Sequence, residues 1–148
     1  MVPFKTKNQI FLILLCITMS MALNGQNLNK HQWKNRVILI ITNDLESETY
    51  ASQTQGFNTN NQEFKERKLI IYKVLPKKYK VDTPKKNSWV LDSKLYTKYN
   101  SNARDFKIIL IGLDGGIKLE QHKVLTTKEL FSTIDSMPMR SSELRNKQ

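Results

Sequence analysis

The chain alternates long apolar runs with polar segments, and this pattern predicts a domain of mixed α and β structure. Three runs rich in β-branched residues, 37–42, 69–75 and 106–113, have the length and continuity of strands buried on both faces of a sheet. Residues 117–120 alternate apolar and polar side chains, which is typical of an edge strand with one face in solvent.

The polar segments between these strands carry apolar residues at helical spacing. Tyr50, Phe57 and Phe64 lie seven residues apart and predict one helix stripe, which Gly56 and the Asn-rich stretch 58–61 break into two pieces. A second, short helix is predicted over residues 92–100. Its stripe recurs every four residues at Leu91, Leu95 and Tyr99.

The last predicted helix has a clear start signal. Residues 126–129 form a capping box, and Leu125 and Leu130 are placed as a hydrophobic staple around it. Pro138 either ends this helix or starts a further turn. Its buried stripe comprises Leu130, Phe131, Ile134 and Met137.

Two connecting segments have distinctive compositions. Asp114, Gly115 and Gly116 predict a tight hairpin turn between the third strand and the edge strand. Residues 76–88 contain two prolines and five lysines, so their composition predicts a loop. That loop is either an anion-binding flap aided by Tyr79 and Trp89 or a solvated connection kept soluble by its charges, which the composition favours.

The predicted order is therefore β-α-β-α-β-β-α, which is the minimal thioredoxin layout. The expected fold class is α/β, with a mixed four-stranded sheet covered by helices. We assign the domain to residues 36–140, with a polar lead-in at 23–35 and a polar tail at 141–148.

The first 22 residues have the features of a secretory signal peptide. Lys5 and Lys7 form a basic start, residues 10–17 form a short apolar core, and Ser20 and Ala22 supply small residues for cleavage. An uncleaved membrane anchor is the alternative, whereas a lipid-anchored Cys16 is disfavoured because Leu15 before it is large. We therefore expect a secreted or periplasmic protein.

Charge and cysteine content narrow the function classes. The formal charge is +11, and removing the signal peptide with its two lysines lowers it to +9. Since Cys16 is the only cysteine, the mature chain has no thiolate nucleophile, redox pair or thiolate metal ligand. The charge suits an envelope protein or an acidic polysaccharide as partner. Nucleic acid is not expected, and the membrane is met only through the uncleaved signal peptide.

The position that carries thiols in active thioredoxins is occupied by residues 43–48. Asp44 and Glu48 lie there, and helix capping explains them more simply than chemistry does. Residues 102–105 replace the expected cis-proline. With two histidines and no second ligand at metal-binding spacing, the sequence predicts no metal, no cofactor and no catalytic residue.

Asp135 and Arg140 are the most unusual charged residues. An aspartate near the C-terminal end of a helix is unfavourable unless it is paired, and Arg140 lies five residues further on. They form either a structural clasp or a site that presents an arginine beside methionines for an acidic ligand.

Three segments resemble a bacterial family of exported thioredoxin-like domains of unknown function. The family is similar to domains in the vertebrate extracellular proteins of the DUDES group. This resemblance implies the fold, and its suggested kinship with peroxiredoxins would imply peroxide reduction, for which this chain has no matching cysteine. The motif residues are Trp33, Arg36, Asp114, Gly115, Gly116, Lys118, Met137, Pro138, Met139 and Arg140.

These observations favour a non-catalytic binding or scaffolding module of the cell envelope. The alternative is a small-ligand-binding enzyme or a redox accessory that uses the thioredoxin cleft without its own thiol. A third hypothesis is attachment to a membrane surface through residues 76–88.

Overall fold

The computed structural model describes residues 28–58, 61–83 and 87–146. The predicted signal peptide and Cys16 lie outside these ranges. Within them, no helix has the length and hydropathy needed to cross a membrane.

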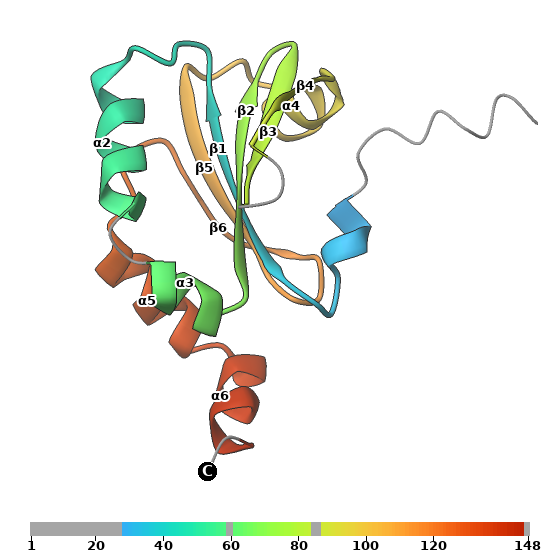
Figure 1. The fold of residues 1–148 in the computed structure, drawn as a ribbon, viewed down its shortest axis with the longest axis vertical. Coiled ribbons are helices and arrows are strands. Elements are labelled where there is room, and N and C mark those ends of the chain that lie inside the picture. Colours follow the sequence, from blue (N-terminus) through green and yellow to red (C-terminus); the bar gives the residue numbers. More distant parts are fainter. Residues whose placement is uncertain (1–27, 59–60, 84–86, 147–148) are drawn as a thin grey trace, which may run out of the picture.

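The core of the molecule is one six-stranded sheet in the order β4-β3-β2-β1-β5-β6 (Figure 1). The central strands β1 and β2 are parallel, and every other neighbouring pair is antiparallel. The strands are β1 (Arg36–Thr42), β2 (Leu69–Leu75), β3 (Lys78–Asp82), β4 (Trp89–Leu91), β5 (Phe106–Ile111) and β6 (Ile117–Gln121).

Helices cover both faces of this sheet (Figure 1). The face covered by α2, α3 and α5 holds one apolar cluster, and the face covered by α4 and η1 holds a second. All seven residues of β1 are buried, because this strand lies in the centre of the sheet between the two clusters. The helices are η1 (Leu28–His31), α2 (Glu48–Asn58), α3 (Asn61–Glu66), α4 (Lys94–Tyr99), α5 (Thr127–Asp135) and α6 (Pro138–Arg145).

The α/β class with helices on a mixed sheet is confirmed. Tyr50, Phe57 and Phe64 enter one apolar cluster from two separate helices, as their spacing predicts. Gly115 adopts a φ of +82° in the turn between β5 and β6, which glycine accommodates without strain. The side chain of Thr126 accepts a hydrogen bond from the amide of Glu129 and so caps α5.

The predicted strand number is wrong, because the sheet has six strands and not four. The segment 76–88 contains β3 and leads into β4, so it is not simply a loop. Its lysines alternate with Tyr79 and Val81, and pairing with β2 buries Tyr79 completely against Tyr72. The lysine content conceals this alternation, and the burial of Tyr79 removes it from any anion-binding flap.

Leu91 and the C-terminal segment also differ from expectation. Leu91 belongs to β4 and is 84% exposed, so it does not contribute to the buried stripe of α4. Pro138 occupies the first turn of α6, where its fixed φ favours helix initiation. Residues 141–145, expected within a polar tail, form the second half of that helix.

Candidate functional site

Arg36 is the first residue of β1, and its side chain is buried despite its charge. Its Nη1 atom donates to the carbonyl of Arg67 at 2.9 Å and to Oε2 of Glu143 at 3.2 Å. These contacts connect the start of the central strand to the segment after α3 and to α6.

Asp135, at the end of α5, accepts hydrogen bonds from two arginines. Arg67 donates through Nε at 3.1 Å and Nη2 at 2.6 Å, and Arg140 donates through Nε at 3.2 Å. Burial alone would raise the pKa of Asp135, but these guanidinium contacts outweigh it and hold that pKa below its usual range. Arg67 also lies over the ring of Phe131, 4.1 Å from its centroid.

Glu143 completes the group from α6. It lies 3.2 Å from Arg36, 3.3 Å from Arg140 and 3.0 Å from Lys68. Burial opposes the charged form, yet the hydrogen bond from Lys68 and the neighbouring cations lower the pKa of Glu143. We refer to the following residues as the arginine cluster: Arg36, Arg67, Lys68, Asp135, Arg140 and Glu143.

Next to this cluster is a cavity of about 260 Å³, which we call the Arg36 cavity. Residues from three distant segments line it: the start of β1, the β5–β6 hairpin and the start of α6. The lining residues are Arg36, Gly112, Leu113, Asp114, Lys118, Met137, Pro138 and Met139. Every lining residue other than Gly112 and Leu113 belongs to the motifs predicted from sequence.

Asp114 stabilises the β5–β6 hairpin where the hairpin lines the cavity. Its Oδ2 lies 2.6 Å from Nζ of Lys118, and its Oδ1 accepts from the amide of Gly116 at 3.1 Å. The Lys118 hydrogen bond, followed by that amide, lowers the pKa of Asp114. A methyl group on Gly112 would lie 2.6 Å from Cε of Lys118, so an alanine at this position would displace the end of the Lys118 side chain.

Trp33 is a motif residue that does not line the cavity. Its side chain is 62% exposed, while its amide donates to the carbonyl of Leu113 at 2.6 Å. Gln32, beside it, donates to the carbonyl of Asp114 at 3.0 Å. The segment before β1 therefore supports the hairpin from outside through its backbone and Gln32.

Asp44 and Glu48 lie at the opposite end of β1. Seven strand residues separate them from the Arg36 end, a distance of about 20 Å at the usual rise per residue. Asp44 Oδ1 accepts from the amide of Glu46 at 2.8 Å, and Glu48 is the first residue of α2. The structure therefore brings Asp135 and Arg140 together but leaves Asp44 and Glu48 apart from them.

The side chains at that end of β1 are engaged with each other. Asn43 donates to Asp105 at 3.2 Å and accepts a hydrogen bond from the hydroxyl of Tyr96. Thr42 Oγ1 donates to the carbonyl of Asp44 at 2.8 Å. These contacts bridge the position where a thioredoxin would carry its thiols.

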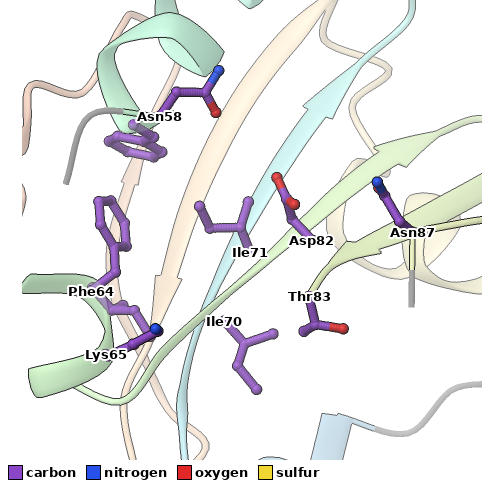
Figure 2. Close-up of a pocket in the computed structure, with 10 residues that line it drawn as sticks. Asn58, Phe64, Lys65, Ile70, Ile71, Asp82, Thr83 and Asn87 are labelled. Atoms are coloured by element: carbon purple, nitrogen blue, oxygen red, sulfur yellow. The ribbon is translucent and has the colours of Figure 1, made fainter. Parts of the chain in front are cut away.

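A second cavity, of about 530 Å³, lies between α2, α3 and the strands β2 and β3 (Figure 2). Phe57, Phe64 and Ile71 are among its apolar lining residues. Figure 2 shows Phe64 on the helix side of the cavity and Asp82 and Asn87 on the strand side. Its polar lining residues come from several segments, and Asp82 among them is already paired with Lys73 at 3.1 Å. The Arg36 cavity, with its buried arginine, is therefore the stronger candidate.

Sequence reasoning missed Arg67, Glu143 and Gly112 as members of this region. Glu143 lies three residues after Arg140 on one helix, and that spacing is a recognised signal for an ion pair. Arg67 pairs with Asp135 across 68 residues, and no local pattern announces such a contact. Among the described residues, no group of three potential ligands is placed to hold a metal ion.

Comparisons with known proteins agree with this architecture. Residues 27–143 match a family described as a domain of unknown function, DUF4174. No curated protein matches the chain. A solved structure, a reduced 2-Cys peroxiredoxin of Plasmodium vivax, is similar with a TM-score of 0.56 at 13% identity, over 79% of this chain and 85% of that chain. This similarity confirms the thioredoxin-like fold, while the chain's single cysteine provides no redox pair.

Proposed function

We propose that this chain, which belongs to the DUF4174 family of domains of unknown function, is a non-catalytic ligand-binding module of the cell envelope. The Arg36 cavity is its binding site. The observation that carries this proposal is the convergence of three distant motif segments on one cavity beside a buried arginine.

The arginine cluster supports the site by fixing its walls. Arg36 and Arg140 both donate to Glu143, so the start of β1 is tied to α6, which carries Met137 and Met139 at its beginning. Asp135 ties the end of α5 to the same helix. The two interpretations of Asp135 and Arg140 are therefore compatible. Their ion pair shapes the cavity, and the residues that line the cavity bind the ligand.

The proposed location rests on the signal-peptide features of residues 1–22. An exported chain with a formal charge of +9 would meet the acidic polysaccharides and proteins of the envelope, which are the proposed partners. The absence of cysteine from the mature chain fits binding better than redox chemistry. The cleft alternative has less support, because Asn43 and Asp44 are engaged in local hydrogen bonds.

The proposal is tested by titrating a library of small fragments against the protein and following its amide NMR signals. Bound fragments are expected to shift the amide signals of residues 112–118 and of Met139 and Arg140. Gly112→Ala should abolish these shifts, because its methyl group displaces Lys118 and Asp114 from the cavity wall. Since both displaced groups are side-chain atoms, the fold should persist.

Gly56→Ala is the matched control. A methyl group there meets no atom within 4 Å, and the residue lies in α2, away from the cavity. This variant should bind fragments as the wild type does. Fragments that bind only at other surfaces, or that bind Gly112→Ala unchanged, would rule out the Arg36 cavity as the binding site.

A further inference from the structure

The Arg36 cavity has the chemistry of an oxyanion site. We infer that its ligand is a small monocarboxylic acid with an apolar substituent, held by its carboxylate between Arg36 and the first turn of α6. This inference rests on the proposed function, and it adds the ligand class to it.

One edge of the Arg36 guanidinium is in use, and the other edge is buried without a hydrogen-bond partner. Its Nη1 atom serves Arg67 and Glu143, whereas Nε and Nη2 have no hydrogen-bond partner among the residues that the structure describes. Those two nitrogens form the side edge of the guanidinium. Their parallel N–H groups match the two oxygens of a carboxylate, which binds such an edge in a bidentate manner. Buried donors left without partners are unfavourable, so this edge favours an acceptor.

The start of α6 provides a second, independent attraction for an anion. Met137 is its N-cap and makes no side-chain capping hydrogen bond within the described chain. Pro138 has no N–H, so Met139 and Arg140 carry the first amides, which have no carbonyl partner inside the helix. The positive end of the helix dipole lies at this point, and Met137, Pro138 and Met139 line the same cavity as Arg36.

The acidic residues near the cavity are paired with cations, so they oppose the binding of a further negative charge only weakly. Lys118 lies on the wall, and Asp114, the carboxylate beside it, is neutralised by it at 2.6 Å. Glu143 contacts Arg36 only through Nη1 and also contacts Lys68 and Arg140. The acidic groups around the cavity are therefore already paired, and an incoming carboxylate reaches the buried edge of Arg36 by displacing the side chains that cover it.

The remaining wall defines the rest of the ligand. Leu113, Met137, Pro138 and Met139 are apolar, and methionine side chains adapt readily to different shapes. The volume of about 260 Å³ falls just below the roughly 300–1,000 Å³ of sites for drug-sized molecules. A short apolar body joined to one carboxylate fits this combination.

The test compares three probes of equal chain length: hexanoate, hexanol and hexyl phosphate. Each is titrated while the amide NMR signals of Met139, Arg140 and the hairpin are followed. Hexanoate should bind at these residues, and hexanol should bind at least about tenfold more weakly, because it lacks the two charged acceptors. Equal binding of hexanol would overturn the carboxylate assignment while leaving the cavity as a binding site. Tighter binding of hexyl phosphate would overturn the choice of carboxylate over phosphate.

A pair of variants tests the location. Met139→Glu places a carboxylate of the protein itself at the start of α6. This carboxylate should compete with hexanoate and weaken hexanoate binding at least about tenfold. Met139→Gln removes the same apolar side chain without adding charge, so Met139→Glu should bind hexanoate at least about tenfold more weakly than Met139→Gln does. Met139 is exposed, and an acidic residue is favourable in a first helical turn, so both variants should fold. Unchanged hexanoate binding by Met139→Glu, or no shift of the cavity amides by hexanoate, would overturn the inference.

Discussion

Replacing Asp135 with asparagine measures what the arginine cluster contributes to stability. The change keeps the shape of the side chain but removes the charge that accepts three hydrogen bonds from Arg67 and Arg140. Hydrogen bonds to charged groups contribute about 1.5–3 kcal/mol each. Because the Asp135 side chain is 36% exposed and the amide keeps one acceptor, water reduces the loss to about 2 kcal/mol in total.

This loss is measured by equilibrium unfolding in urea. A change of about 2 kcal/mol should lower the midpoint by about 1 M, given the usual dependence on denaturant for a domain of this size. Glu129→Gln is the control, because it removes a negative charge from the first turn of the same helix at an exposed position. Its midpoint should move by much less.

The pH dependence provides a second check on the same reasoning. The pKa of Asp135 is lowered in the folded state, so its stabilisation is complete above the unfolded value of 3.8 and is lost as pH falls through the folded pKa. The difference in urea midpoint between the wild type and Asp135→Asn should therefore shrink toward zero as the pH is lowered. A difference that persists unchanged at the lowest pH, or no difference at neutral pH, would refute the reasoning.

Three further changes test other parts of the fold. Gly115→Ala should lower the free energy of unfolding by about 1 kcal/mol, because alanine is strained at a φ of +82°. Gly116→Ala should lower it by less, and thermal unfolding of the two variants measures the difference. Gln53→Leu should lower the free energy of unfolding in urea by about 3 kcal/mol, because it leaves the buried amide and carbonyl of Leu125 without partners. Gln55→Leu, on the exposed side of α2, should leave this free energy nearly unchanged. Burial raises the pKa of Tyr72 to about 12, so an absorbance titration of tyrosinate should contain a component that ionises near pH 12; a titration that is complete well below that pH would contradict the burial of Tyr72.

The parts of the fold that sequence predicts are those with strong local signals. The apolar run of β1 is continuous because both faces of that strand are buried, and the capping of α5 by Thr126 depends on residues three positions apart. β3 escaped prediction because its lysines outweigh the alternation of Tyr79 and Val81 in composition. Its pairing with β2 is what gives those two residues an interior to face.

The candidate site was predictable only in part for a related reason. Asp135 and Arg140 are five residues apart, and their charges at a helix end give a visible signal. The burial of Arg36 has no such signal, since a charged residue at the start of a strand is ordinarily exposed. Its carboxylate partner, Glu143, lies 107 residues later, and only the packing of α6 brings the two together.

That separation has a consequence for how the chain is made. Arg36 is synthesised 107 residues before Glu143, its carboxylate partner. Until Glu143 has been made, a folded sheet would bury the Arg36 charge without that partner, which is strongly unfavourable. The sheet should therefore stay open until α6 has been translated. A chain arrested just before Glu143 should remain sensitive to protease during synthesis, and one arrested after Arg145 should become resistant once it clears the ribosomal tunnel.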